Sequence, residues 1–346
     1  MRDKKVKVAI AGYGVIGKRV AAATALQDDM ELVGVADVAS DWRLRAAQQK
    51  GVRVFSAIDA QADAMWQAGI EIAGNLNDLL DDADIVVDCT PKRVAAKNVP
   101  IYKERKLKFI VQGGEAHEVA GHSFVAEATY ESAFGKDATR VVSCNTTSIV
   151  RTLSALKRAG LLKRARGTLL RRATDPWESH EGGIMNTLVP EKHIPSHQGP
   201  DAQSVDPVLD VVTMAVKVPE TLAHLHFWNV ELSRAAEREE ILAAFRSSSR
   251  ISLIKMGDGL SALNSVKELM ADLGRPHDNL YEVALWEDLV TVQGTEVFYA
   301  YMVDNQAIVI PETIDAIRAL TGSERDGAAS IAKTNASLGI GDGFYR

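Results

Sequence analysis

The stretch Lys5-Val6-Lys7-Val8-Ala9-Ile10-Ala11-Gly12-Tyr13-Gly14-Val15-Ile16-Gly17 decides how the first half of the chain folds. Its opening residues alternate between charged and apolar and then become wholly apolar, which is typical of a buried parallel strand. A glycine-rich turn follows, and an alanine-rich segment over 18–26 predicts a helix. A second strand is expected over 30–37, so this part of the chain predicts a βαβ unit.

The glycines of the turn have the spacing Gly-x-Gly-x-x-Gly, which indicates dinucleotide binding when it joins a strand to a helix. Gly12 permits the tight turn, Gly14 lets the backbone approach a pyrophosphate, and Gly17 lets helix and strand pack closely. The positive N-terminus of the helix then stabilises the phosphate charge. The alternative interpretation is an ordinary glycine-rich turn.

Asp37 ends the second predicted strand, about 20 residues beyond the turn, where a carboxylate can accept hydrogen bonds from a ribose 2′-OH. The same charge repels a 2′-phosphate, so we predict NAD rather than NADP as the cofactor. NADP stays possible because Arg43 and Arg45 are nearby in sequence and can serve a 2′-phosphate if the loop folds back.

Strands alternate with helical segments up to about residue 143. Further strands are expected over 85–89, 109–112 and 141–143, with helical segments between them. This alternation favours an α/β fold, a Rossmann-type doubly wound parallel sheet.

The pattern changes after residue 143. Longer alternating strands, with few helices between them, favour an α+β catalytic domain with a mostly antiparallel sheet. Apolar segments near the C-terminus predict helices that return to the first domain. We therefore expect an NAD(P)-binding Rossmann domain over 1–143 and about 305–346, and a catalytic domain over 144–304. The strands of the second domain are expected over 166–173, 208–216, 224–232, 282–286 and 290–303.

The composition excludes several classes of protein. A chain of 346 residues is long enough for two domains, and its net charge of −6 gives no reason to expect nucleic acid or an anionic membrane as a partner. No apolar run reaches the roughly 18 residues of a membrane span, and no signal peptide is expected. The only cysteines are Cys89 and Cys144, so we expect a reducing cytoplasm instead of a disulfide framework. No Cys/His spacing predicts a metal site.

A nucleophile is expected in the segment Ser143-Cys144-Asn145-Thr146-Thr147, at a junction between a strand and a helix. A thiol at a helix N-terminus feels the positive end of the dipole, which lowers its pKa and raises the thiolate fraction. The backbone amides there and the Asn145 side chain can hold a developing oxyanion. Cys89 is inside a hydrophobic strand and fits a structural role.

A nucleophilic thiol needs a base, and the chain has eight histidines. His224 and His226 alternate on one predicted strand, so they share one face and form a polar wall. By chemistry alone, His224, His226 and His197 are nearly equal candidates. Arg171-Arg172 at a strand end is either an anion clamp, with Arg172 beside hydroxyl groups for a phosphorylated ligand, or a surface pair.

Together these residues resemble the archaeal-type (class II) phosphorylating glyceraldehyde-3-phosphate dehydrogenases over nearly the whole chain. The resemblance is carried by six ordered segments. They are Gly12-Tyr13-Gly14-Val15-Ile16-Gly17-Lys18-Arg19-Val20, Gln112-Gly113-Gly114-Glu115, Ser143-Cys144-Asn145-Thr146-Thr147, Arg171-Arg172-Ala173-Thr174-Asp175-Pro176, Ile194-Pro195-Ser196-His197-Gln198-Gly199-Pro200-Asp201 and Pro311-Glu312-Thr313-Ile314-Asp315-Ala316-Ile317-Arg318-Ala319.

The resemblance implies roles for several residues of this chain. Cys144 would be the nucleophile and His224 the first choice for the base. The substrate or inorganic phosphate would contact Ser143, Asn145, Thr146, His197 and Gln198. The cofactor would contact Val15, Ile16, Gly113, Arg172 and Asn305, and we also expect Thr90 there. The family further implies a homotetramer in the cytoplasm, with a phosphorylated aldehyde and inorganic phosphate as its small-molecule partners.

The chain departs from the family pattern at three of these positions. The family has His-His where this chain has His197-Gln198, and Gln198 cannot become cationic. Members that accept NADP often have a lysine in place of Asp37. A family glutamine at the cofactor corresponds to Asn305, which has a shorter amide side chain.

We predict NAD(P)-dependent phosphorylating oxidation of glyceraldehyde 3-phosphate to 1,3-bisphosphoglycerate through a cysteine thiohemiacetal and thioester. One alternative is a dehydrogenase of another phosphorylated aldehyde, or of a semialdehyde, with the same cysteine mechanism. Another is a non-catalytic NAD-binding thiol-redox sensor, which would have a reactive Cys144 but no turnover.

Overall fold

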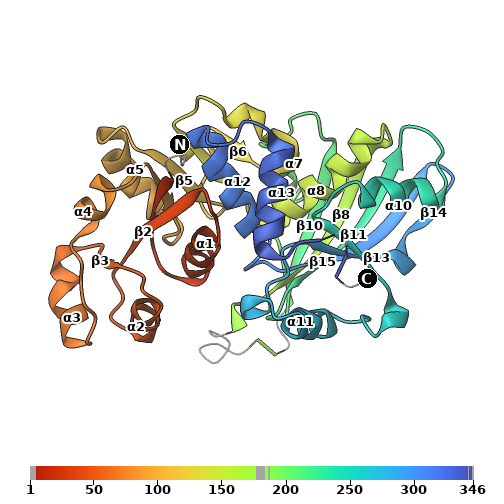
Figure 1. Ribbon diagram of the computed structural model, residues 1–346. Helices are drawn as coiled ribbons and strands as arrows, with labels where there is room; N and C mark the ends of the chain where they lie inside the picture. The colour runs from red at the N-terminus through yellow and green to blue at the C-terminus, as the bar shows by residue number, and fades with distance from the viewer. Residues whose placement is uncertain (1–4, 177–183, 186–187, 342, 345–346) are drawn as a thin grey trace. The chain divides into compact units, whose positions relative to one another are not determined.

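The computed structural model describes residues 5–176, 184–185, 188–341 and 343–344. The chain divides into two compact units (Figure 1). Met1–Val142 and Ile310–Leu338 form the first unit, and Ser143–Val309 and Gly339–Arg346 form the second. In Figure 1 the last long helices, α12 (Val309–Thr321) and α13 (Gly327–Leu338), are blue, and they lie in the first unit although the chain reaches them last.

The first unit contains a parallel sheet with the strand order β3-β2-β1-β4-β5-β7-β6. The order reverses between β1 and β4, and in such sheets the crevice at the carboxyl ends of these strands is where ligands bind. The expected doubly wound Rossmann-type sheet is confirmed. Its strands are β1 Val6–Ala11, β2 Met30–Asp37, β3 Val54–Ser56, β4 Ile85–Asp88, β5 Lys108–Gln112, β6 Ser123–Phe124 and β7 Ala138–Val141.

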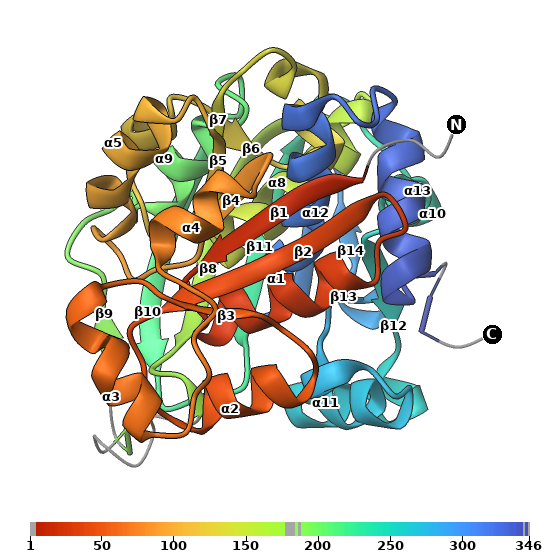
Figure 2. The same ribbon diagram turned by 60° about the vertical axis from the view of Figure 1, so that its left-hand side comes forward.

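Helices connect these strands, and local sequence explains where they begin. Figure 2 shows α1 (Val15–Ala25) running along β1 and β2, as expected for a βαβ unit. Asp41 caps the next helix by accepting from the Arg43 amide, and Asn75 caps another through a capping box. The remaining helices before residue 143 are α2 Trp42–Gln49, α3 Ala62–Gln67, α4 Leu76–Asp81, α5 Ala95–Glu104, α6 His117–Ala120 and α7 Ala126–Thr129.

The second unit contains a mixed sheet with the order β12-β13-β15-β11-β8-β10-β9, and β14 pairs with β15. Its pairs are mostly antiparallel, as expected, but β10 pairs with β8, and β12 with β13, in parallel. The strands are β8 Leu162–Arg172, β9 Val189–Pro190, β10 Val211–Val218, β11 His224–Leu232, β12 Ile251–Ile254, β13 Val283–Trp286, β14 Thr291–Gln293 and β15 Glu296–Val303. The helices are α8 Cys144–Arg158, α9 Gln198–Gln203, α10 Arg238–Arg246 and α11 Leu263–Asp272.

Two expectations for the second unit were wrong in detail. The single strand expected over 290–303 is the hairpin of β14 and β15, because the chain turns at Gly294, whose φ is 63°. Helices α10 and α11 also lie between β11 and β13, where few helices were expected.

The core of the second unit explains why two histidines face inward. Along β11, residues alternate between buried and less buried, and His224, His226 and Trp228 all lie on the buried side. The same alternation leaves Phe227 exposed on the other face. The long helix α8, most of whose residues are buried, meets this face at its first turn, where Cys144 contacts His224 and Asn145 contacts His226.

A buried arginine on α12 holds this C-terminal helix against the rest of the first unit. Arg318 on α12 is fully buried and donates to both carboxylate oxygens of Asp29, at 2.7 and 2.9 Å. It also donates to Gln27 at 2.8 Å and to Thr334 at 2.6 Å. Burial raises the pKa of Asp29, but the hydrogen bonds and charge of Arg318 outweigh it, and the pKa is lowered.

Arg318→Ala should lower the free energy of unfolding by about 3 kcal/mol, because it leaves a partly buried carboxylate without its cation. Urea unfolding followed by circular dichroism measures this loss. Arg325→Ala, which removes an exposed arginine, is the matched control and should change stability by less than about 0.5 kcal/mol. Equal stability of the two variants would contradict the importance of this ion pair.

Candidate active site

The glycine turn has the shape that a pyrophosphate needs. Gly12 has a φ of 87°, and a Cβ there would lie 2.9 Å from backbone atoms of Cys89 and Thr90. A Cβ on Gly17 would lie 1.9 Å from the Gly12 carbonyl oxygen, so neither position accepts a side chain. Gly14 has open space around its missing side chain and precedes α1 without a side-chain cap. The first-turn amides, including those of the half-buried Val15 and Ile16, therefore suit a phosphate.

Asp37 holds this turn in place as well as ending β2. Its Oδ2 accepts from the Tyr13 amide at 2.5 Å, and its Oδ1 accepts from the amides of Val38 and Ala39 at 2.7 and 2.8 Å. The two arginines that favoured NADP are bonded elsewhere. Arg43 donates to both oxygens of the Asp41 carboxylate, at 3.0 and 2.6 Å, and Arg45 donates to the Ala68 carbonyl oxygen at 3.0 Å.

The other cofactor candidates of the first unit lie at strand ends. Thr90 follows β4, and its amide and hydroxyl donate to Asp88 at 3.0 and 2.5 Å. Gly113 follows β5 directly. In the second unit, Oδ1 of Asn305 is buried with no hydrogen-bond partner among the described residues. Such an unpaired acceptor fits an amide donor of a ligand.

Cys144 is the first residue of α8, a helix of 15 residues. Ser143 caps this helix, because its Oγ accepts from the Thr146 amide at 3.3 Å. The Cys144 sulfur lies 3.5 Å from Nε2 of His224. The capped helix start, the thiol and one of the expected histidines thus come together within the second unit.

The pKa of Cys144 differs from the expectation. Burial raises it to about 11, although the charges of Arg172 and Arg171 and the Asn145 amide each lower it. The predicted depression at the helix N-terminus was therefore wrong, because desolvation of the thiolate raises the pKa by more than the nearby positive charges and the Asn145 amide lower it. The resting group is a thiol.

His224 is held in one tautomer by a backbone group. The Arg172 amide donates to its Nδ1 at 3.0 Å, so this nitrogen has to be an acceptor. Burial, together with the charges of His226, Arg172 and Arg171, holds the pKa of His224 well below its usual value. The imidazole is neutral, and its single proton is on Nε2, directed at the Cys144 sulfur.

Both terminal nitrogens of the Arg172 side chain form hydrogen bonds. Its Nη1 donates to the carbonyl oxygens of Thr174 and Thr221 at 2.9 and 3.3 Å, and its Nη2 donates to Asp175 at 2.6 Å. Asp175 also accepts from Gln306 at 2.7 Å. Arg172 therefore orders the segment after β8, and its positive charge still acts on the Cys144 sulfur.

The residues proposed to bind the substrate or inorganic phosphate lie around α9. Thr146 donates to Asp201 on α9 at 2.5 Å, which links this helix to the start of α8. Gln198 is fully buried, and neither polar atom of its side chain has a partner among the described residues. His197 is exposed, with its Nδ1 3.8 Å from Glu191. An amide that is buried and unsatisfied is costly, so Gln198 is ready for a polar ligand.

Some participants were missed by sequence reasoning. The Tyr301 hydroxyl lies 3.0 Å from Nδ1 of His226, and Tyr301 is on β15. No local sequence pattern predicts that β15 pairs with β11. Asp201 and Asp175 lie within two of the segments that carry the family resemblance. An acidic residue beside residues proposed to bind an anion was the feature of the sequence that could have identified them. His226 does not contact the thiol but binds Oδ1 of Asn145 at 2.8 Å.

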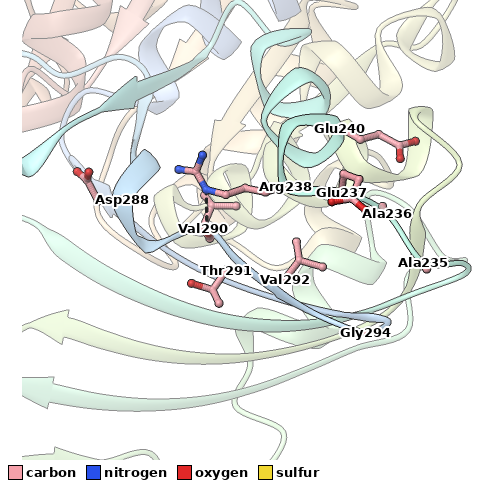
Figure 3. Close-up of a pocket in the computed structure, with 10 residues that line it drawn as sticks. All are labelled: Ala235, Ala236, Glu237, Arg238, Glu240, Asp288, Val290, Thr291, Val292 and Gly294. Atoms are coloured by element: carbon pink, nitrogen blue, oxygen red, sulfur yellow. Dashed lines mark hydrogen bonds between the residues drawn. The ribbon is translucent and has the colours of Figure 1, made fainter.

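A separate pocket of about 850 Å³ lies in the second unit near α10 and β14 (Figure 3). On one side Arg238 donates to the Val290 carbonyl oxygen at 3.1 Å, the dashed line in Figure 3. No residue of the predicted site lines this pocket. Among the described residues, no group of three or more His, Cys, Asp or Glu side chains is arranged to hold a metal ion. None of the helices in the described part of the chain is long and apolar enough to cross a membrane.

Comparison with known proteins agrees with this arrangement. Residues 143–272 match the family described as "Glyceraldehyde 3-phosphate dehydrogenase, C-terminal domain", and residues 6–146 match "Dihydrodipicolinate reductase, N-terminus". Glyceraldehyde-3-phosphate dehydrogenase of Methanobrevibacter smithii is 44% identical over 335 residues, which is 96% of this chain and 99% of that protein. The chain belongs to the archaeal-type glyceraldehyde-3-phosphate dehydrogenase family.

Other archaeal-type glyceraldehyde-3-phosphate dehydrogenases are similarly close. The enzyme of Thermococcus kodakarensis is 44% identical over 97% of this chain and 99% of its own length. That of Methanothermus fervidus is 42% identical over 96% of this chain and 98% of its own length. The resemblance seen in the sequence is thus confirmed, and the chain is an oxidoreductase that uses NAD(P).

Proposed function

We propose that this chain catalyses the NAD(P)-dependent phosphorylating oxidation of glyceraldehyde 3-phosphate to 1,3-bisphosphoglycerate. The observation that carries the proposal is the contact of 3.5 Å between the Cys144 sulfur and Nε2 of His224, at the start of a capped helix. Family membership supports the substrate, and the fit of the glycine turn to a pyrophosphate supports the cofactor.

In the proposed reaction the Cys144 sulfur attacks the aldehyde carbon and gives a thiohemiacetal. The hydroxyl group of this adduct then releases its proton to solvent water while the carbon loses a hydride, which leaves a thioester on Cys144. NAD(P), when bound, supplies the acceptor for that hydride. Inorganic phosphate attacks the thioester carbonyl, the carbon–sulfur bond breaks, and the products are an acyl phosphate and the free thiol.

His224 has a defined part in this scheme. Its Nε2–H group, fixed by the Arg172 amide at Nδ1, can donate to the sulfur and to the oxygen that develops negative charge. The base expected from the sequence needs a free lone pair at Nε2, which the resting tautomer does not offer. We therefore assign His224 as a hydrogen-bond donor in the addition step.

Binding of phosphate groups is assigned to the residues around α9. Ser143 and Thr146 lie at the start of α8, and the Thr146–Asp201 hydrogen bond brings α9 to it. Gln198 supplies a buried donor and acceptor, and His197 supplies an exposed imidazole. The neutral amide of Gln198 is the observation that favours the second candidate, oxidation of another phosphorylated aldehyde or of a semialdehyde by the same chemistry.

Initial rates with glyceraldehyde 3-phosphate, with NAD or NADP and with or without inorganic phosphate, test the proposal. We expect turnover that depends on phosphate and exceeds the turnover of erythrose 4-phosphate and aspartate semialdehyde. A higher kcat/KM for either of those aldehydes would favour the second candidate. A reactive Cys144 without turnover on any aldehyde would favour a thiol-redox sensor.

Cofactor preference is tested at Asp37. Asp37→Asn keeps an acceptor for the Tyr13 amide but removes the negative charge, so the ratio of kcat/KM for NADP over NAD should rise by about tenfold. Dissociation constants for both cofactors, measured by titration calorimetry, check the effect apart from turnover. An unchanged ratio would mean that another group selects NAD.

We also infer a homotetramer in the cytoplasm. Support for assembly comes from the exposed face of the second sheet, where Phe227 and Met214 line a largely apolar hollow of about 390 Å³. Both cysteines are free, in keeping with a reducing compartment. Sedimentation velocity measures the mass in solution, and a monomer at micromolar concentration would contradict the assignment.

A further inference from the structure

Two large apolar side chains are exposed in the segment that follows β2. Val38 is 48% exposed, and Trp42, the first residue of α2, is 63% exposed. Single exposed apolar residues are common on protein surfaces, but here two of them stand in one short segment beside the predicted cofactor site. An aromatic ring left open to water at such a place can bind a flat part of a ligand.

The Trp42 ring lies beside the first turns of α1. Nζ of Lys18 is over this ring, 6.0 Å from its centroid. Lys18 is one helical turn beyond the glycine turn, because its amide donates to the Gly14 carbonyl oxygen at 3.1 Å. The ring therefore belongs to the part of the first unit where the N-terminus of α1 suits a pyrophosphate.

Hydrogen bonds hold both ends of the segment that carries the ring. Oδ1 of Asp37 accepts from the amides of Val38 and Ala39, at 2.7 and 2.8 Å. Asp41 caps α2 by accepting from the Arg43 amide at 2.9 Å. The backbone that positions the indole is thus ordered before a ligand arrives, which lowers the entropy lost on binding.

The position of this segment matches the adenosine half of a dinucleotide. In doubly wound folds the pyrophosphate lies at the first helix, and the acidic residue that ends the second strand binds the ribose of the adenosine. Asp37 is that residue here, so the base attached to this ribose reaches the chain next to the segment over 38–42. A purine base is a flat π system, and such bases stack on exposed aromatic side chains.

The geometry points to Trp42, together with Val38, as the surface on which the adenine of NAD(P) stacks. The ammonium group of Lys18 lies within cation–π range of the ring and holds it beside α1. This inference deepens the cofactor site and rests on the use of NAD(P) by the chain, and it does not depend on which aldehyde is oxidised. The rival occupant of this surface is a second copy of the chain.

Trp42→Ala should weaken the binding of NAD by about tenfold or more, measured by titration calorimetry without aldehyde. ADP-ribose, which lacks the nicotinamide, should lose affinity by the same factor, because the lost contact is with the adenine. Trp66→Ala is the control of matched exposure, since Trp66 is 70% exposed on α3 of the same unit, and it should change neither affinity. Equal losses in the two variants, or a loss for NAD alone, would overturn the inference.

Trp42→Tyr keeps an aromatic ring and should recover most of the affinity that Trp42→Ala loses. Stacking of a base on an indole quenches its fluorescence, so ADP-ribose should quench the emission of the wild type and of Trp66→Ala more than that of Trp42→Tyr. Equal quenching in the three proteins would overturn the inference, because the emission that responds would then belong to another tryptophan.

Sedimentation velocity separates the rival occupant from the adenine. Trp42→Ala should keep the mass of the wild type in solution. A smaller mass, together with unchanged affinity for ADP-ribose, would assign the ring to a contact between copies of the chain and overturn the inference. A wild type that binds NAD but oxidises no aldehyde would refute the proposed function alone, and the affinities for ADP-ribose would still decide the role of Trp42.

Discussion

Cys144→Ala should reduce the rate of glyceraldehyde 3-phosphate oxidation by on the order of 10⁴-fold or more, because no other group in the site can form the thiohemiacetal. NAD binding should be retained, because the glycine turn and Asp37 lie in the other unit of the chain. Steady-state rates measure the first effect, and titration calorimetry with NAD measures the second. Unchanged turnover would refute the covalent route.

Cys89→Ala is the matched control, because Cys89 is the other free cysteine of the chain and follows a buried strand. Its thiol pKa is also raised, mainly by burial, so it should react slowly with alkylating agents. We expect this variant to keep most of its activity. If Cys89→Ala lost as much activity as Cys144→Ala, loss of activity could not be used to identify Cys144 as the nucleophile.

The pKa of Cys144 adds a dependence on pH that can be measured without substrate. A thiol with a pKa of about 11 is mostly protonated at neutral pH, and its thiolate fraction rises tenfold with each pH unit below that value. Inactivation of the free enzyme by iodoacetamide should therefore accelerate about tenfold per unit from pH 7 to pH 10. A rate that levels off near pH 7 would mean that the helix N-terminus and Arg172 outweigh burial.

Local patterns predicted β1, β2, β4 and β5 of the first unit, but β3 and β6 were missed, and the strand expected over 141–143 is β7, Ala138–Val141. The strand expected over 30–37 is β2, Met30–Asp37, because parallel strands buried on both faces leave continuous apolar runs between turn signals. The hairpin of β14 and β15 was missed for the opposite reason. Alternation continues on both sides of Gly294, so one apolar pattern covers two strands that fold back on each other.

The candidate site was predictable only where its chemistry is local. The Ser143 cap and the thiol of Cys144 are adjacent in sequence, and the residues around them predict the start of a helix. The choice between His224 and His226 was not local, because both lie on the same face of β11. Only the position of α8 decides it, since Cys144 contacts His224 and Asn145 contacts His226. The pKa of Cys144 could not be predicted from the sequence either, because it depends on how deeply the folded chain buries the sulfur.

His224→Ala should lower kcat by roughly 10²–10⁴-fold, the usual effect of removing a group that acts on protons or developing charge. His224→Gln separates the two kinds of action. The Gln amide can donate a hydrogen bond to the sulfur or to the oxyanion, but it cannot take up a proton at working pH. Because the Arg172 amide holds His224 as an Nε2–H donor, we expect the Gln variant to keep at least about tenfold more activity than the Ala variant.

The dependence of kcat on pH checks the same assignment. The pKa of His224 is held well below its usual value, so the imidazole is neutral above that depressed pKa and its titration should produce no loss of kcat between pH 8 and pH 6. His277→Gln, at an exposed position, serves as the control for a general loss of a histidine. Equal losses in the Gln and Ala variants of His224, together with an acidic limb that disappears in both, would make His224 the base after all. The Arg172 hydrogen bond would then have to break during turnover, and the imidazole would have to rotate to free Nε2.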